Sequence, residues 1–260
     1  AIAIPAIMPI AVTVASGEDS TVEAVVDYTQ TGLLLVVSGD AEKMNYSYTA
    51  ADLGIALKSL VVDGAPIEIG ALEVMLKDLA GNSSMTTGSL RGLEQAMQAG
   101  SIMYTVDFKD PETQDTAKMK GSANSLTFKG TGSYPEKMDM QDMAAMLKAG
   151  FAFDGVFGYS GGSSEFHITD AGATTDVATK SEGGDFKVAM DQKRLAYDLA
   201  SRGVEINMSG GEIPFPVELK MAEAGFKLMM PVAKSDAEQD FSLAFRMGNF
   251  TMSDAIWGMF

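Results

Sequence analysis

The sequence predicts a mainly β protein, built as one long, curled antiparallel meander with one or two short helices. Apolar and polar side chains alternate in segment after segment, and short connections rich in glycine, aspartate and asparagine separate these segments. Period-two alternation places one face of a strand in a core and the other in water. Short turns suit antiparallel neighbours joined by hairpins. A meander of roughly fifteen strands is too long for a flat sheet, so we expect a trough or a sandwich.

The predicted strands follow one another closely along the chain. They are the alternating segments 22–28, 33–37, 44–48, 53–57, 67–69, 102–108, 186–190, 195–199, 204–208, 217–221, 226–230 and 241–247. Hairpin turns are predicted where glycine and aspartate gather, at 38–40, 63–64, 183–184, 191–194 and 209–211. Each such turn allows the next strand to pair with the one before it.

One segment is typical of a helix. Asp139 can cap a helix that runs to 149, and Gly150 stands at the position where helices commonly end. A second, shorter helix is predicted over 90–98, because Leu93 and Met97 are four residues apart.

Composition limits the function classes. The 260 residues carry 19 Lys and Arg against 35 Asp and Glu, a formal charge of −16 spread along the chain. Nucleic acids and anionic membranes are bound through clustered basic residues, so no nucleic-acid partner is predicted. The absence of cysteine excludes disulfides and thiolate catalysis. No apolar stretch approaches the ~20 residues of a membrane-spanning helix, and no linker divides the chain, so we predict one elongated domain over 1–260.

Both ends of the chain are unusual. Residues 1–5 lack an initiator methionine and a basic segment, and residues 255–260 form an apolar run. We therefore expect a chain that is truncated at both ends.

Residues 158–162 match the G-x-S-x-G pattern of a nucleophile elbow around Ser160. That motif requires a strand-to-helix turn and a histidine supplied after an acidic partner. His167 is the single histidine and follows Ser160 by seven residues with no Asp between them. We predict a glycine-rich hairpin turn here, and a protein that is not an enzyme and has no catalytic residues.

Methionine is abundant, with 19 residues scattered over the chain. Met-rich segments can bind Cu(I) through their thioethers, but methionines at helical spacing form an ordinary apolar face. We therefore predict no metal site and no cofactor. The candidate apolar interaction surface consists of the helix residues and the apolar C-terminal end: Met140, Met143, Met146, Leu147, Trp257 and Phe260.

Four segments carry a resemblance to a known family: 138–145, 211–217, 228–232 and 253–260. With them the chain resembles the alphaproteobacterial proteins of domain of unknown function 2125 (DUF2125) over nearly its whole length. The resemblance implies an exported, periplasmic protein whose signal peptide is removed or not included, and a fragment of a longer member. It supplies no catalytic residues. The predicted meander is also similar in style to AsmA-type proteins, which shelter lipid tails in a β-trough.

Two functions follow as hypotheses. The first is a periplasmic, non-enzymatic protein of the cell envelope that binds a lipid or other apolar ligand along a β-trough, with Met208, Met221, Met229 and Met230 among its lining. The second is an accessory or scaffold subunit of an envelope complex, docked through the helix or the apolar C-terminal end. The same apolar residues could instead pack on one another in a closed sandwich core. The ligand, the partner and the oligomeric state are left open.

Overall fold

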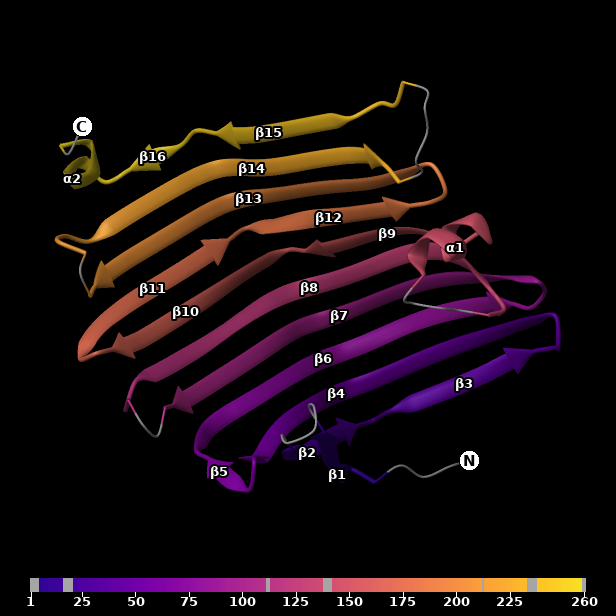
Figure 1. Cartoon of the computed structure of the whole chain (residues 1–260), viewed down its shortest axis with the longest axis horizontal. Coiled ribbons are helices and arrows are strands. Elements are labelled where there is room, and N and C mark those ends of the chain that lie inside the picture. The colour runs from indigo at the N-terminus through magenta and orange to yellow at the C-terminus, as the bar shows by residue number, and fades with distance from the viewer. Residues whose placement is uncertain are drawn as a thin grey trace.

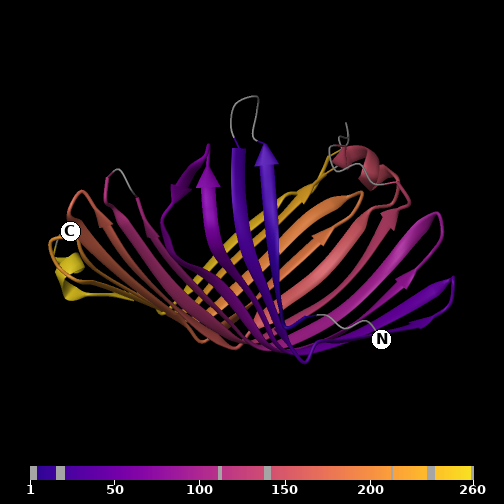
Figure 2. The same cartoon turned by 90° about the horizontal axis from the view of Figure 1, so that it is seen from below.

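The fold is one antiparallel sheet of 16 strands with two short helices (Figure 1). The computed structural model describes residues 5–15, 21–110, 113–137, 142–211, 213–232 and 238–258. No second sheet packs on the first within these ranges, so the predicted meander forms a trough and not a sandwich. Figure 2 shows the trough from one end, with both slopes rising from a bend near the middle of the strands.

The strands of the N-terminal half are β1 (Ile7–Ala15), β2 (Thr21–Thr31), β3 (Leu34–Gly39), β4 (Lys43–Val62), β5 (Ala65–Ile67), β6 (Ile69–Thr86), β7 (Leu90–Lys109) and β8 (Thr116–Pro135). Helix α1 (Met143–Lys148) follows. The strands of the second half are β9 (Ala152–Tyr159), β10 (Gly161–Asp170), β11 (Ala173–Ser181), β12 (Gly183–Met190), β13 (Arg194–Gly210), β14 (Val217–Pro231), β15 (Ser242–Gly248) and β16 (Thr251–Met252), and α2 (Asp254–Trp257) comes last.

Several strands continue one another along a single long neighbour. Strands β9 and β10 both pair with β8, β11 and β12 both pair with β13, and β15 and β16 both pair with β14. The sheet is therefore a meander of long ribs, some of them interrupted at the bend.

A line of residues in the left-handed backbone region crosses the sheet at this bend. Asp78 (φ 52°), Ser125 (φ 49°) and Gly203 (φ 54°) lie inside β6, β8 and β13. Gly161 and Gly183, also with positive φ, are the first residues of β10 and β12, where these strands continue from β9 and β11. At each of these points the alternation of apolar residues shifts by one position, which keeps the apolar side chains of both slopes on one face.

The apolar face is the concave one. The Lys43 carbonyl accepts a hydrogen bond from Asp40 on the β3 side of β4. The view of Figure 1 looks into the trough. Given the direction of β4 in that view and the L configuration of its residues, a Lys43 carbonyl directed towards β3 places the Lys43 side chain on the convex face and the Met44 side chain on the concave face. Burial agrees, since Ala50, Leu79 and Ala99 at the inside of the bend are only 3%, 8% and 4% exposed.

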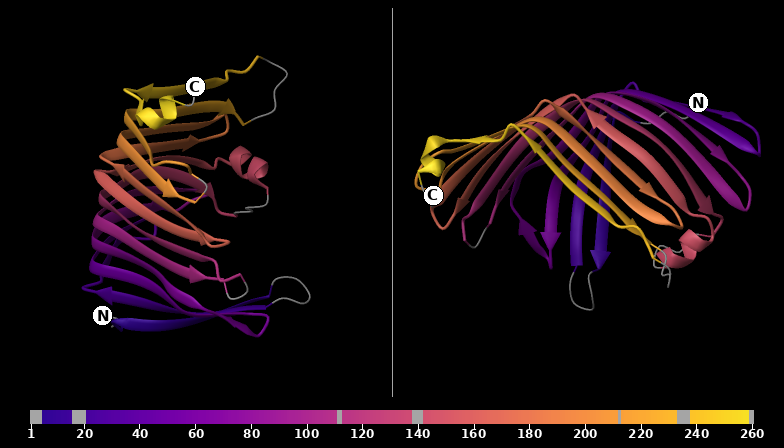
Figure 3. Two further views of the ribbon diagram at one scale, coloured as in Figure 1. Left: turned by 90° about the vertical axis from the view of Figure 1, so that its left-hand side faces the viewer. Right: turned by 90° about the horizontal axis from the view of Figure 1, so that it is seen from above.

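Helix α1 lies on the concave side, at the ends of β8, β9 and β12 (Figures 2 and 3). The Ser133 hydroxyl donates to the Gly150 carbonyl at 2.7 Å, and the Gln192 side-chain amide donates to the Lys148 carbonyl at 3.0 Å. Met146 and Leu147 are buried beneath the helix. The helix therefore closes one corner of the trough and leaves the rest of the concave face uncovered.

Four predicted segments need correction. Segment 90–98 is part of β7 and not a helix, because β6 and β8 pair with it on both sides and this pairing outweighs its helical spacing. The predicted helix 139–149 is shorter, since Asp142 caps it by accepting a hydrogen bond from the Ala145 amide at 2.9 Å; Asp139 lies outside the described residues. Residues 158–162 and 183–184 are not hairpin turns. They lie where β9 continues into β10 and β11 into β12, and both strands of each pair run antiparallel to one common neighbour.

The turn between β12 and β13 generates a prediction about pH. The Asp191 carboxylate accepts hydrogen bonds from the amides of Lys193 (2.7 Å) and Arg194 (3.1 Å), and the Lys193 bond above all lowers the pKa of Asp191 below its ordinary 3.8. A lowered folded-state pKa contributes stability above pH 3.8 that is lost as the pH falls through the lowered value. Asp191→Ala should therefore be less stable than wild type near neutral pH, and the difference should shrink in acid.

Urea unfolding at a series of values between about pH 6 and about pH 3 measures this difference. Asp191→Asn is the control, because it keeps an oxygen acceptor without the titrating charge, and it should lose less stability than Asp191→Ala near neutral pH. A difference between wild type and Asp191→Ala that is constant over the whole range would contradict the prediction.

Candidate ligand-binding trough

The concave face carries a row of apolar side chains that crosses ten strands without a charged residue. Each member is the direct cross-strand partner of the next, from β3 at one edge to β15 at the other. This aromatic row consists of Leu35, Tyr48, Gly81, Met97, Phe128, Phe157, Phe186, Leu199, Phe226 and Phe245. Ring contacts bind it together, with centroids 4.5 Å apart for Phe128 and Phe157 and 5.3 Å apart for Phe226 and Phe245.

A second row crosses the opposite slope of the trough. This aliphatic row consists of Leu72, Val106, Met119, Phe166, Val177, Met208 and Val217, again as successive cross-strand partners. Its members from Val106 to Val217 are half-buried, whereas the lysines on either side of Met119 are exposed. Neither slope brings a charge into its row, so together the two rows form an extended surface suited to apolar matter.

Tyrosine rings lie over glycines on this face. A Cβ built on Gly81 would stand 2.5 Å from the ring of its partner Tyr48, and one on Gly121 would stand 2.6 Å from the ring of Tyr104. The Tyr104 hydroxyl then donates to Ser164 at 2.8 Å across the intervening strand. Because each glycine leaves room for the ring to lie along the sheet, the tyrosines add apolar surface without filling the trough.

The apolar face is open to solvent over much of its area. Phe157 is 47% exposed and Leu199 is 42% exposed, although both lie in the middle of the aromatic row. At the β15 edge the exposure of Phe245 rises to 75%. Large aromatic side chains in the interior of a protein are ordinarily covered, so this surface has the character of a core without a second layer.

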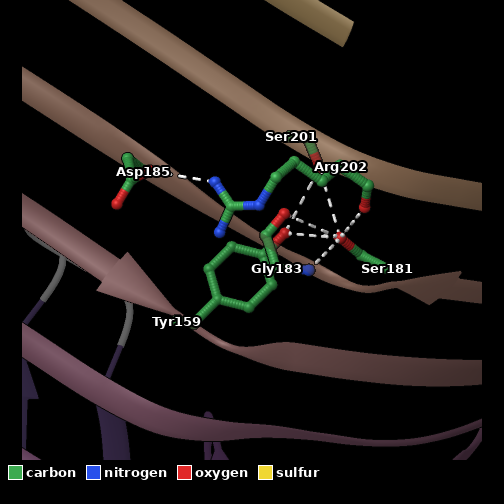
Figure 4. A network of polar contacts seen from close by, with 6 residues as sticks. All are labelled: Tyr159, Ser181, Gly183, Asp185, Ser201 and Arg202. Carbon is green, nitrogen blue, oxygen red and sulfur yellow. Dashed lines mark hydrogen bonds and ion pairs between the residues drawn. The ribbon is translucent and has the colours of Figure 1, made fainter. Parts of the chain in front are cut away.

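A cluster of hydroxyl groups interrupts the apolar floor at the bend (Figure 4). The Tyr159 hydroxyl lies 3.0 Å from the Ser181 hydroxyl and 3.4 Å from the Ser201 hydroxyl, and the two serine oxygens are 3.3 Å apart. Ser181 accepts from the Gly183 amide at 3.2 Å and can donate to the Arg202 carbonyl at 3.1 Å. We call Tyr159, Ser181 and Ser201 the hydroxyl cluster.

The convex face is polar, and many of its charges are paired across strands. Lys120 lies 2.8 Å from Glu165, Lys118 lies 3.2 Å from Asp107, and Lys227 of β14 lies 2.8 Å from Asp198. A hollow of about 820 Å³ runs between two rows of these side chains, and its lining includes Lys118, Lys120, Glu165, His167 and Asp176 together with the members of the aliphatic row from Val106 to Val217. Lys118 and Lys120 are each paired with a carboxylate within 3.2 Å, and His167 Nδ1 lies 2.6 Å from Asp176 Oδ1, so the polar groups of the hollow are largely matched with one another.

The structure separates the residues of the suspected surface. Met146 and Leu147 are 2% and 8% exposed, so these two side chains belong to the packing of α1 and cannot serve as a docking surface. Met143 is half-buried. Trp257 on α2 is 57% exposed. Met140 and Phe260 lie outside the described residues.

The methionines that suggested a trough lining divide between the two faces. Met208, Met221 and Met230 occupy concave positions, whereas Met229 pairs with Ala196 and Ser242 on the convex face. The prediction that Met229 lines the trough is therefore wrong.

Ser160 and His167 do not form a catalytic pair. Ser160 lies at the bend and His167 lies seven residues further along the extended chain, which places them roughly 20 Å apart. His167 instead faces Asp176 of the next strand, with Nδ1 and Oδ1 2.6 Å apart. The G-x-S-x-G segment forms the bend between β9 and β10.

Sequence reasoning missed the aromatic row and the hydroxyl cluster. Their members come from strands far apart in the chain, and a register is needed to bring them together. Neither short helix in the described part of the chain has the length or the apolar run needed to cross a bilayer. Comparisons with protein-family models, curated proteins and solved structures find no match to this chain, so the resemblance to DUF2125 stays a prediction.

The tyrosine and glycine pairs generate a prediction about stability. In Gly121→Ala the new methyl group would meet the Tyr104 ring at 2.6 Å and the Ser164 hydroxyl at 2.7 Å, so the ring must move and its hydrogen bond must break. We expect a loss of about 1–3 kcal/mol in the free energy of unfolding, measured by urea denaturation. Gly225→Ala is the matched control, because its methyl group meets no atom closer than 3.4 Å. Equal stabilities of the two variants would refute this role of the ring.

Proposed function

We propose that the protein is a non-enzymatic binding protein that holds the hydrocarbon chain of a lipid along its concave face. The observation that carries the proposal is the aromatic row, which offers an uncharged apolar surface across ten paired strands while remaining open to solvent. The aliphatic row widens this surface on the other slope. A periplasmic location, expected from the family resemblance, belongs to the same proposal.

The energetics favour a long-chain ligand. Burial of one methylene group contributes about 0.8 kcal/mol, so about ten methylene groups in contact with the trough would contribute ~8 kcal/mol before the cost of ordering the chain. A net binding energy of ~8 kcal/mol corresponds to a dissociation constant near the micromolar range, so a chain longer than about ten methylene groups is needed to reach that affinity after the ordering cost. Polar contacts are not required for it.

The charge distribution supports the same proposal. Charged side chains gather on the convex face, and the formal charge is −16. Such a surface keeps the protein soluble and disfavours nonspecific contact with anionic membrane surfaces. A ligand would then enter the trough as a single molecule or be handed over by a partner.

The alternative, an accessory or scaffold subunit, stays a prediction. Its helical docking surface loses support, because Met146 and Leu147 are buried. The exposed Trp257 leaves the C-terminal part of that hypothesis open.

A charge placed in the aromatic row tests the proposal. Phe157→Glu puts a carboxylate between Phe128 and Phe186 on the concave face, and we expect it to weaken binding of a fluorescent acyl probe by at least about tenfold. Val156→Glu is the matched control, since the neighbouring position points to the convex face between Lys129 and Lys187 and should leave probe binding unchanged. Equal loss, or no loss, in the two variants would sink the proposal.

Native mass spectrometry of protein purified from a membrane-containing extract, followed by lipid extraction of the same sample, gives an independent measurement. The expected result is a retained lipid mass in wild type and Val156→Glu that is depleted in Phe157→Glu. A protein that carries stoichiometric partner mass and no lipid would favour the scaffold instead.

A further inference from the structure

We propose that the hydroxyl cluster binds the neutral carbonyl group of an ester- or amide-linked long-chain ligand, an inference that rests on the proposed function and specifies its ligand class. Tyr159, Ser181 and Ser201 lie at the bend, where the two apolar slopes meet. A chain extended along either slope can therefore present a polar group to the cluster.

The floor around the cluster is built from small residues. On the β11 and β12 rib, Gly184 is the direct partner of both Tyr159 and Ser201, and Gly162 is the direct partner of Ser181. A Cβ on Gly184 would stand 2.9 Å from the Tyr159 ring, so the ring lies along the floor.

The other end of the bend has the opposite character. There Ala50, Leu79 and Ala99 form a buried apolar cluster packed against Leu53 and Leu76. Tyr48 also packs against this apolar cluster, and its hydroxyl accepts a hydrogen bond from the Gln95 side-chain amide at 3.1 Å. The hydroxyl cluster brings three hydroxyl groups together at its end of the bend, whereas the buried residues at the other end are apolar, so the cluster is the better position for the polar part of a ligand, with hydrocarbon on the slopes.

The hydroxyl groups can change their hydrogen-bond partners. A hydroxyl group carries one hydrogen that rotates and two acceptor positions, and the contacts of Tyr159 with Ser181 and Ser201 can form with either group as donor. Ser181 is anchored by the Gly183 amide and the Arg202 carbonyl. Tyr159 or Ser201 can therefore turn its hydrogen towards a ligand oxygen while the cluster keeps its place.

The charges favour a neutral oxygen over a carboxylate. Two cations are adjacent in sequence to the cluster, Lys180 beside Ser181 and Arg202 beside Ser201. Lys180 lies opposite Glu205 of β13, and the Arg202 guanidinium lies 3.1 Å from the Asp185 carboxylate. The aromatic and aliphatic rows contain no Lys or Arg, and the formal charge of the chain is −16. A free fatty acid would bring a negative charge to hydroxyl groups whose two neighbouring cations face Glu205 and Asp185, so an ester or amide carbonyl suits the site better.

Displacement of diphenylhexatriene, a hydrocarbon fluorophore, tests this inference. Methyl palmitate, palmitate and hexadecane are compared as competitors on wild type, on the triple variant Tyr159→Phe/Ser181→Ala/Ser201→Ala, and on the convex-face control Ser163→Ala. On wild type and on the control, methyl palmitate should displace the probe at roughly two- to tenfold lower concentration than hexadecane. The triple variant should lose this preference and keep its affinity for hexadecane.

The outcomes separate the two proposals. If wild type binds the fluorophore but shows no preference for the ester, prefers palmitate, or keeps its preference in the triple variant, the carbonyl site is overturned and the apolar trough stands. If wild type does not bind the fluorophore, the trough itself is overturned, and the carbonyl site with it. Circular dichroism and urea midpoints of the triple variant guard against a loss caused by misfolding, and Ser181→Ala alone, with a smaller loss of preference expected, replaces it if it fails to fold.

Discussion

The cross-strand register is the constraint on which the rest of this structure depends. No second layer covers the described sheet, so the hydrogen-bond ladders alone decide which side chains share a face. Phe128 pairs with Phe157 on the concave side while Lys129 pairs with Val156 on the convex side. A slip of one residue would carry the lysine into the trough and the phenylalanine into water, so side-chain polarity fixes the register as strongly as a closed core would.

The bend solves a problem that long strands create. In β8, unbroken alternation from Phe128 towards the other end of the strand would place Lys120 and Lys118 on the concave face. Ser125, in the left-handed region at φ 49°, shifts the alternation by one position and returns Met119 to the trough. A non-glycine residue in this region costs about 1–2 kcal/mol. That cost is small beside the burial of an aliphatic row over a whole slope.

The sequence predicted which side chains of a strand share a face of the sheet, but it did not predict which strands are neighbours. Period-two alternation predicted the strands, their antiparallel pairing and the curling of the sheet, because these follow from local pattern and turn chemistry. Segments 195–199 and 204–208 were expected as two strands and form the single strand β13. A glycine with positive φ marks a turn or a bend equally well, and the partner strand decides between them. The shift in alternation over too few residues for a turn is the signal that could have identified the bend.

The hydroxyl cluster and the tyrosine and glycine pairs lie beyond local pattern for the same reason. Tyr159, Ser181 and Ser201 meet only because the strands that carry them lie side by side in the sheet. Their spacing in the sequence does not predict this contact. The pairing of Tyr48 with Gly81 and of Tyr104 with Gly121 gives the sheet apolar contact area that lies along its surface. A single layer whose concave face stays open needs cohesion between its strands that does not fill the trough. Rings laid over glycines supply that cohesion, and so the feature that stabilises the single layer is also the feature that keeps it open.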